Sequence, residues 1–229
     1  MRIAVDLHIH SALSPCAEDD MTPNNIVNMA LLKELDAIAI TDHNSCDNVC
    51  SAMKVAGSRL IILPGMEVQS REEVHLLCYF AELAALVGFE TVVGHHLSGP
   101  ANDPTRFGRQ LILNERDEVI GEKEKLLISS VDLSIDEIVG EVRRRGGVVV
   151  PAHVDRPSYS ILSQLGFIPP ELGFKMLEIS KNGAGFLPQD DKFSYLSSSD
   201  AHCLGDILER EVFLFVDDLS AYSLLKSLA

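Results

Sequence analysis

Three features of this sequence predict an α/β fold with a mainly parallel sheet. Short, continuous apolar runs recur along the chain, for example at residues 36–40 and 59–63. Such runs are typical of strands that are buried on both faces. Helix signals alternate with the runs, and metal-binding residue types follow the ends of several runs. The pattern indicates strand–helix units whose strand ends share one rim.

Helices are predicted where a capping residue precedes a stretch that can form a helix. The predicted helices are residues 23–34 after the cap Thr22, 45–55 beginning at the cap Ser45, 134–145 with a capping box of Ser134 and Glu137, and a short helix after Ser220. The strands expected between them are residues 3–5, 36–40, 59–63, 148–151, 176–179, 193–199 and 212–216. The alternation of these elements favours a parallel sheet with helices packed on it.

Residues 89–125 interrupt this alternation. The first part of the segment contains many turn-forming residues. Its second part, from residue 107, has the pattern of two strands around a polar turn at residues 114–118. We therefore predict one domain over residues 1–229, with an insertion or lid at about 89–125.

Composition narrows the classes of partner. The chain has 229 residues, of which 46% are hydrophobic, and a net charge of -15. This acidity argues against binding long nucleic acid or an anionic membrane, since both require a basic surface. The five cysteines include no CxxC pair, and the chain shows no signal region and no apolar stretch of membrane-spanning length. A reducing, cytoplasmic location is therefore expected.

Residue types that bind metals end five of the apolar runs. His8 and His10 end the first run, and side chains two positions apart on a strand point the same way. They can converge on one ion, although two half-buried polar residues at a strand end would give the same pattern. The other such residues are Asp6, Asp42, His43, Glu67, His153, Asp155, Asp200 and His202. Five such runs favour a metal centre at the carboxyl ends of the strands.

His75 begins an apolar run instead of ending one. Glu67 and His75 are equally distant from Arg71, so a hairpin turning near residues 70–72 would make them cross-strand neighbours. His75 would then face the same centre. The alternative is an exposed histidine on a strand that faces solvent.

Five motifs in order resemble those of the PHP family, which is named for polymerase and histidinol phosphatase. They are DLHIHS (6–11), ITDHN (40–44), GMEV (65–68) with EVHLL (73–77), PAHVDRP (151–157) and SSDAH (198–202). The resemblance runs from about residue 3 to residue 203. It implies a distorted (β/α)7 barrel, two or three divalent metal ions at the strand carboxyl ends, and hydrolysis of phosphoesters.

The resemblance also implies how the ligands divide among the ions. His8, His10, Glu67 and Asp200 would hold one ion, Glu67 would bridge to a second held by His75 and His153, and His43 and His202 would bind the third. Members of the family usually supply one more His or Asp soon after the HxH pair, but residues 11–20 contain no histidine. Cys16, Glu18 or Asp20 could replace it, and Cys16 is nearest the expected place.

The ligand types suit Mn²⁺, Zn²⁺ or Fe²⁺. Two such ions close together can lower the pKa of a shared water into the neutral range, and the resulting hydroxide would attack phosphorus. Glu67 is expected to be central to catalysis because it would hold two ions. Arg156 could bind a phosphate, while an ion pair with Asp155 or another carboxylate is the alternative. Lys181 is a weaker phosphate candidate.

Other polar residues receive supporting roles. Asp6 and Asp42 are expected to orient ligands by accepting the second imidazole N–H. His95 and His96 match no motif and are expected to face solvent.

Several functions fit the resemblance. The substrate could be a small phosphorylated metabolite, a nucleotide or a short oligonucleotide, and histidinol-phosphate phosphatase is an alternative within the enzyme class. A non-catalytic metal-binding or regulatory PHP module is the alternative of another class. An amidohydrolase would be expected to carry a ligating lysine at a strand end, and no lysine occupies such a position.

Overall fold

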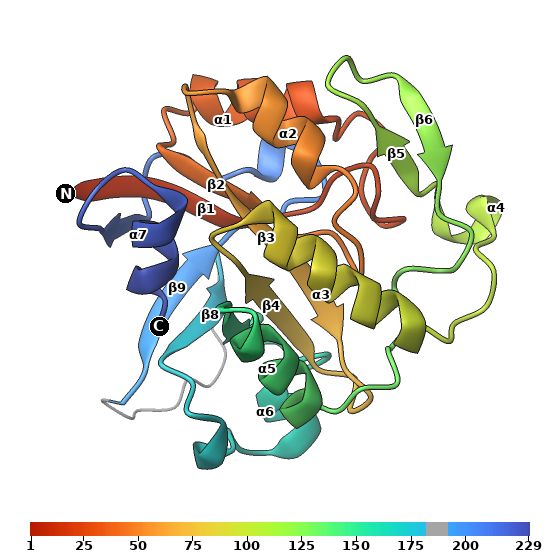
Figure 1. Cartoon of the computed structure of the whole chain (residues 1–229), viewed down its shortest axis with the longest axis vertical. Helices are drawn as coiled ribbons and strands as arrows, with labels where there is room; N and C mark the ends of the chain where they lie inside the picture. The colour runs from red at the N-terminus through yellow and green to blue at the C-terminus, as the bar shows by residue number, and fades with distance from the viewer. Residues whose placement is uncertain (182–191) are drawn as a thin grey trace.

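The computed structural model describes residues 1–181 and 192–229 and has an α/β fold (Figure 1), which confirms the predicted class. The strands in these residues are β1 (Arg2–Ile9), β2 (Ala37–Ile40), β3 (Ile61–Gln69), β4 (His75–Tyr79), β5 (Leu111–Leu113), β6 (Val119–Glu122), β7 (Val148–Pro151), β8 (Met176–Ser180), β9 (Ser194–Ser198) and β10 (Phe213–Phe215). The helices are α1 (Pro23–Leu32), α2 (Val49–Ala56), α3 (Leu83–His96), α4 (Pro104–Phe107), α5 (Ile135–Arg144), α6 (Ile161–Leu165) and α7 (Ala221–Ser227), with 3-10 helices at Pro170–Leu172 and Leu204–Asp206.

Six strands form one curled sheet in the order β10-β1-β2-β3-β4-β7. The strands β1, β2 and β3 run parallel, whereas β4 is antiparallel to both of its neighbours and β10 is antiparallel to β1. The parallel pair β8–β9 stands between β7 and β1, joined by the hydrogen bonds Val154 N–H to Glu178 O and His10 N–H to Ala201 O. The sheet is therefore a curled half-barrel, and β4 breaks the parallel repeat of a regular (β/α)7 barrel.

The alternation of side chains along the strands divides the core into two layers. On β2, Ile38 and Ile40 belong to the outer layer, which the larger helices cover. Ala37 and Ala39 belong to the inner layer inside the curl, where small residues leave room for neighbours. The inner layer also contains Leu63, Leu77, Tyr79, Val150 and Leu196, and α7 with its C-cap residue adds Leu224, Leu225 and Leu228 to it. Buried polar residues, among them His8, His10 and Glu67, occupy the end of the curl at the carboxyl end of β1.

A shift in register positions the histidines of β1. The pairing of β1 with β2 is irregular between Asp6 and Ile9. Leu7 lies in the inner layer, whereas Ile9, two residues later, lies in the outer layer. Because a bulge changes which face successive residues occupy, His8 and His10 face the inside of the curl at the carboxyl end of β1.

Most of the predicted helix starts are confirmed, and one is wrong. Thr22 accepts the Asn25 N–H, the Ser134–Glu137 capping box is complete, and the Ser220 side chain accepts the Ser223 N–H. The predicted start of α2 at Ser45 is wrong, because the helix begins after Asn48. The Ser45 hydroxyl instead donates to Glu90 Oε1 at 2.6 Å, and this contact commits it outside the helix.

The predicted loop at the start of 89–125 is also wrong, because α3 continues to His96. Leu86, Phe89 and Val93 are fully buried at helical spacing, and their burial outweighs the local turn formers. The predicted strand pair is present as the antiparallel hairpin β5–β6. Its first strand is fixed to the body by Asn48, whose amide donates to Leu111 O and accepts from Leu113 N–H.

All five cysteines are free thiols. No helix in the described part of the chain combines the length and the apolar character needed to cross a lipid bilayer.

Candidate metal centre

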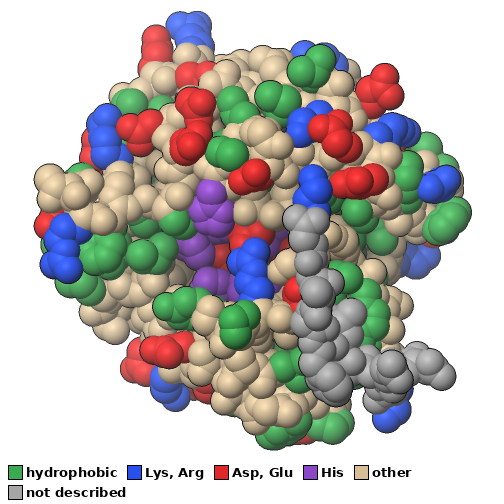
Figure 2. Space-filling view, turned by 180° about the vertical axis from the view of Figure 1, so that it is seen from behind, with side chains coloured by type: hydrophobic (Ala, Val, Ile, Leu, Met, Phe, Trp, Pro, Cys, Tyr) green, Lys and Arg blue, Asp and Glu red, His purple; other side chains and the backbone are tan. Residues whose placement is uncertain are grey.

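Histidine side chains gather in a hollow on one face of the molecule, with acidic side chains between them and a basic side chain beside them (Figure 2). A cavity of about 260 Å³ opens there. The residues that line it are Cys16, His43, Glu67, Gln69, His75, Ile128, His153, Arg156, Ser158, Tyr159, Asp200 and His202. The cavity therefore joins residues of the predicted motifs from across the chain.

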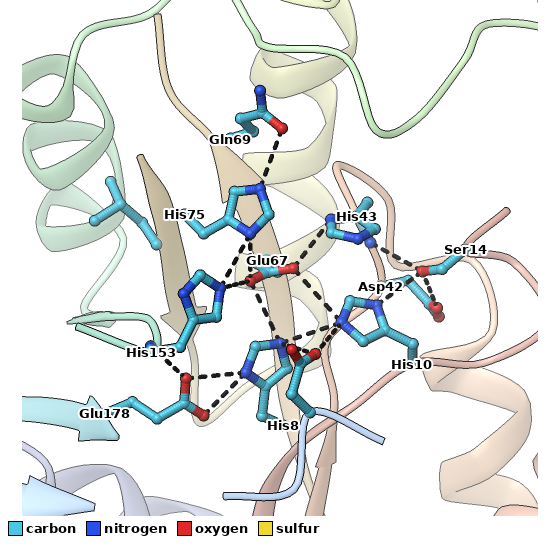
Figure 3. A network of polar contacts seen from close by, with 12 residues as sticks. His8, His10, Ser14, Asp42, His43, Glu67, Gln69, His75, His153 and Glu178 are labelled. Carbon is cyan, nitrogen blue, oxygen red and sulfur yellow. Dashed lines mark hydrogen bonds and ion pairs between the residues drawn. The ribbon is translucent and has the colours of Figure 1, made fainter. Parts of the chain in front are cut away.

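Glu67 lies at the middle of the cluster (Figure 3). It is buried, with 1% exposure, and it continues the inner face of β3 beyond Leu63. Its carboxylate oxygens lie close to ring nitrogens of His8 (3.4 Å), His10 (3.5 Å), His43 (3.0 Å), His75 (2.9 Å) and His153 (3.4 Å). Neither oxygen has a partner in hydrogen-bond geometry. Five imidazoles thus surround one buried carboxylate without donating to it.

Asp200 joins the histidines of β1 on the other side of Glu67. Its Oδ1 lies 3.0 Å from His10 Nε2 and 3.2 Å from His8 Nε2. The two Nε2 atoms are 3.1 Å apart. These three side chains form one of the groups whose ligand atoms are close enough to hold a single ion.

A second such group consists of His43, Glu67 and His75, and a third of His10, His43 and His202. His202 Nε2 lies 3.2 Å from the sulfur of Cys16. All three residues considered for this place are exposed, but Cys16 lines the cavity and Glu18 and Asp20 do not. The structure therefore brings Cys16, and not the acidic residues, to the histidines.

Four of the imidazoles have an acceptor at their second ring nitrogen that fixes the ring, whereas the buried Nδ1 of His153 has no partner among the described residues. These contacts are His8 Nδ1 to Glu178 (2.9 and 3.0 Å), His10 Nδ1 to Ser14 Oγ (3.0 Å), His75 Nε2 to Gln69 Oε1 (3.1 Å) and His202 Nδ1 to the Asp200 carbonyl (2.8 Å). A ring that donates from one nitrogen presents the lone pair of its other nitrogen. His8, His10 and His75 therefore turn lone pairs toward Glu67 and Asp200, and His202 turns one toward Cys16.

Glu178 is a member of the centre that the sequence analysis missed. It lies on β8, is 1% exposed and also accepts the backbone N–H of His153 at 2.9 Å. The available signal was a single acidic residue inside the apolar run MLEI, because a carboxylate in a buried strand requires partners. Gln69 and Ser14 were missed as well.

The prediction that Asp6 and Asp42 accept an imidazole N–H directly is wrong. Asp6 accepts the backbone N–H groups of Ser199 and Leu208. Asp42 accepts from the Ser14 hydroxyl at 2.7 Å, and so it reaches His10 only through that serine. The bulge in β1 explains the case of Asp6, since it places that residue on a different face from the histidines.

The predicted hairpin between Glu67 and His75 is present, but its register differs from the expected one. His75 pairs with Gln69, and Glu67 pairs with Leu77. Glu67 and His75 are therefore diagonal neighbours, a spacing at which long side chains still meet. Their contact of 2.9 Å places His75 in the cluster and rules out the exposed alternative.

Two residues of the cluster have backbones in the left-handed region. The φ angle is 30° at His153 and 52° at Asp200. Side chains other than glycine rarely adopt these angles, and such strain concentrates at functional sites. His153 follows the end of β7 and Asp200 follows the end of β9, so both strained residues lie where a strand of the curl ends.

Charges in the cluster suit a cation. Burial opposes ionisation of Glu67, but the facing rings of His75 and His8 hold the pKa of its carboxyl well below the usual value. Burial likewise opposes ionisation of Asp200, and His8 and His10 lower the pKa of its carboxyl. Burial lowers the pKa of the His10 and His75 rings, whereas in His8 and His43 the facing carboxylates outweigh burial and raise the pKa of the ring. A bound cation would take the place of those ring protons. Ionised carboxylates and neutral imidazoles are the forms that ligate metals.

Arg156 stands at the mouth of the cavity. Its Nη1 lies 2.5 Å from Asp200 Oδ2, and its Nε donates to the Ser180 hydroxyl at 3.1 Å. The carboxylate partner anticipated as an alternative is therefore Asp200 instead of Asp155. Lys181 pairs with Glu211 at 3.6 Å and does not line the cavity. His95 is exposed and His96 half-buried at the end of α3, and neither lines the cavity.

The donor set fits divalent metal ions. Neither oxygen of the buried Glu67 carboxylate has a hydrogen-bond partner, and the buried His43 Nδ1 that faces it has none either. Buried, unpaired polar atoms are costly, and a cation among them would remove that cost. Mixed nitrogen and oxygen donors of this kind suit first-row transition metals.

Comparisons with known proteins agree with this fold. An uncharacterized protein of Methanocaldococcus jannaschii is 25% identical over 216 residues, which cover 94% of this chain and 23% of that protein. Endonuclease Q from Pyrococcus furiosus superposes with a TM-score of 0.73 at 21% identity, covering all of this chain and 56% of that one. A Bifidobacterium adolescentis protein named as a metal-dependent phosphoesterase superposes with a TM-score of 0.63 at 19% identity, covering 98% and 96%.

The chain thus spans about a quarter of the archaeal relative and just over half of endonuclease Q. The model of the PHP domain matches residues 6–146, which is more than half of the chain. The resemblance read from the motifs is confirmed, and the chain belongs to the PHP domain family.

Proposed function

We propose that this protein is a metal-dependent hydrolase of phosphoesters. The observation that carries the proposal is Glu67, a buried carboxylate with five imidazoles within 3.5 Å and no hydrogen-bond partner. Such an arrangement is unfavourable without cations and favourable with them. The non-catalytic alternative remains an outcome of the test below.

The residues would hold two or three divalent ions, with Mn²⁺, Zn²⁺ and Fe²⁺ as the candidates. His8, His10, Glu67 and Asp200 form the first ligand set, Glu67, His75 and His153 the second, and His43, His202 and Cys16 the third. His43 also lies 3.0 Å from Glu67 and so stands between the second and third sets. We further propose that β8–β9 completes a distorted (β/α)7 barrel around this centre, within one domain over residues 1–229.

The protein's own residues position the reacting groups. When bound, the ions would supply an acidified water and neutralise charge on the phosphoryl oxygens. Glu67 would fix the spacing between two ions, because one rigidly held carboxylate contacts both ligand sets. Arg156 would exchange its contact with Asp200 for a phosphoryl oxygen, which its planar guanidinium can bind through two N–H groups.

The substrate class we propose is a small phosphorylated metabolite, a nucleotide or a short oligonucleotide. One solved structure of endonuclease Q holds a 27-mer duplex with an abasic lesion at the active site, and that likeness supports including oligonucleotides. The net charge of -15 argues against extended contact with nucleic acid. The free thiols support a reducing, cytoplasmic location.

The test compares the wild type with Glu67→Ala and Glu67→Gln, using a generic phosphomonoester and phosphodiester with Mn²⁺ or Zn²⁺ supplied. The wild type should hydrolyse at least one substrate and contain two or more ions by elemental analysis. Both variants should lose activity and at least one ion, because the ligand shared between the ions is gone.

Glu115→Gln is the matched control, since Glu115 is exposed and pairs with Lys54 at the surface. It should retain activity and metal content. Full activity with full metal content in Glu67→Ala would contradict the proposal. Bound metal without hydrolysis of any phosphoester would favour the non-catalytic module.

A further inference from the structure

A half-exposed tyrosine stands beside the metal centre, and no step proposed above uses it. Tyr159 lines the cavity and is 44% exposed. Its ring stacks on the imidazole of His75, with centroids 4.9 Å apart and planes inclined by 19°. One face of the tyrosine ring is thus covered by His75, and the exposure leaves the rest of the ring to the cavity and solvent.

The backbone holds this ring at a cost. Tyr159 has a φ of 56°, in the left-handed region that bulky residues rarely adopt. Its carbonyl accepts the His75 N–H at 2.9 Å, and the following Ser160 hydroxyl donates to the Arg156 carbonyl at 2.7 Å. Strain that the surroundings maintain at a pocket points to a functional role.

The charge of the cavity limits what it can hold. Arg156 is the sole Lys or Arg among the described residues that line it. One guanidinium beside the metal ligands can serve one phosphoryl group, whereas a run of phosphates requires several cations. The cavity therefore offers one phosphate position and, next to it, one aromatic surface.

We propose that Tyr159 is a stacking surface for a nucleobase, so that the substrate is a nucleoside phosphate: a nucleotide or the terminal nucleotide of a short strand. The inference rests on the proposed hydrolysis for its phosphate position. Every nucleobase has a π-face, and stacking on an aromatic side chain is a sequence-tolerant way to bind it. Arg156 and Tyr159 lie three residues apart in one loop, so the loop binds phosphate and base together.

The experiment compares ligands with and without a base. The phosphonate analogues of adenosine 5′-monophosphate and of ribose 5-phosphate cannot be hydrolysed, and their binding is measured by calorimetry with Mn²⁺ present. The variants are Tyr159→Leu, Tyr159→Phe and, as a matched control, Tyr222→Leu on α7, where the tyrosine is 71% exposed and outside the cavity lining.

The wild type should bind the adenosine analogue about tenfold more tightly than the ribose analogue. Tyr159→Leu should remove that difference and leave ribose binding unchanged, while Tyr159→Phe and Tyr222→Leu should resemble the wild type. In hydrolysis assays, Tyr159→Leu should raise the KM for the nucleotide and keep kcat, as expected for lost uniform binding.

Equal binding of the two analogues by the wild type would overturn the inference, and so would binding of neither. An equal loss of both in Tyr159→Leu would also overturn it, because the tyrosine would then only support His75. Binding that follows the expected pattern without any hydrolysis would keep the stacking surface and reject the proposed hydrolysis.

Discussion

At the scale of single residues, the second contacts of the imidazoles matter as much as the ligands. Glu178 meets His8 Nδ1 with both of its oxygens and accepts the His153 N–H, so it orients residues of two proposed ligand sets. A carboxylate behind an imidazole fixes the rotation of the ring and raises its basicity. Glu178 is therefore a positioning residue.

We expect Glu178→Gln to weaken Mn²⁺ binding roughly 10- to 100-fold, because the amide keeps the shape and loses the charge behind His8. Calorimetric titration of the metal-free protein measures the affinity. Glu178→Asp, which keeps the charge, should recover part of the loss, and the exposed Glu115→Gln should have no effect. Unchanged affinity in Glu178→Gln would show that the contact is only structural.

Cys16 offers a pH-dependent readout in the metal-free protein. The residue is exposed, but protein around the thiol disfavours its charged form, and hydrogen bonds with His202 and His43 outweigh this and lower its pKa to about 7. The reactive thiolate should therefore form as the pH rises through about 7, and the alkylation rate should rise with it. Mass spectrometry of iodoacetamide-treated protein measures this rate, and Cys16→Ser should lose the fast modification.

Alkylation in the presence of Zn²⁺ tests whether Cys16 is a metal ligand. A coordinated thiolate should be protected from alkylation when Zn²⁺ is bound, and Cys16→Ser should lower occupancy of one ion and shift preference away from Zn²⁺ and Fe²⁺ toward Mn²⁺. Alkylation that continues at the same rate in the zinc-loaded protein would exclude Cys16 and return attention to Glu18 and Asp20.

The site residues that were predicted from the sequence belong to recognisable motifs, whereas the residues that were missed do not. His8, Glu67 and Asp200 belong to motifs whose order along the chain is visible in the sequence itself. The partner of His8 is Glu178, which is 170 positions away, and only folding brings the two together. Local patterns therefore identify ligands, whereas the residues that orient them depend on contacts across the sheet.

At the scale of elements, local signals predicted helix starts better than they predicted packing. The Ser134 capping box is a self-contained arrangement of neighbouring residues, and it was predicted correctly. The continuation of α3 depends on burial of Phe89 and Val93 against the body, which the turn formers around them concealed. The bulge in β1 has no local signature, and it places Asp6 on a different face from His8 and His10.

Gly140 in the middle of α5 and Gly147, which directly precedes β7, provide a matched pair. A Cβ at Gly147 would lie 2.7 Å from the Phe80 ring, the Tyr79 carbonyl and the Val142 side chain, whereas Gly140 has nothing within 4 Å. Gly147→Ala should lower the free energy of unfolding by about 1–3 kcal/mol through overpacking. Gly140→Ala should raise it by about 0.5–1 kcal/mol because alanine favours the helix.

Urea unfolding followed by circular dichroism measures both variants. The opposite signs are the sharp part of the prediction, since both changes add the same methyl group. A Gly147→Ala variant as stable as the wild type would mean that α5 and β4 can move apart without cost.

At the scale of the whole molecule, the centre joins the two ends of the described chain. Its members come from β1, β8, the ends of β2, β7 and β9, and the β3–β4 hairpin, from His8 to His202 (Figure 1). The fold class and the rim were predictable because buried strands and their polar ends recur along the sequence. The pairing of β10 with β1 and the place of β8–β9 were not predictable, since they depend on how the sheet curls.

This spread of ligands along the chain has a kinetic consequence. His8 and Asp200 become neighbours only after the sheet has curled, and contacts between residues so distant in sequence form late in folding. Interactions that are absent from the folding transition state change the unfolding rate and leave the folding rate nearly unchanged. Stopped-flow experiments should therefore find that Mn²⁺ slows unfolding and leaves refolding unaffected, whereas faster refolding with Mn²⁺ would show early capture by the His8–His10 pair. In a growing polypeptide, the first histidine pair would wait until the chain had been made as far as His202, so the ions would be inserted only after that point.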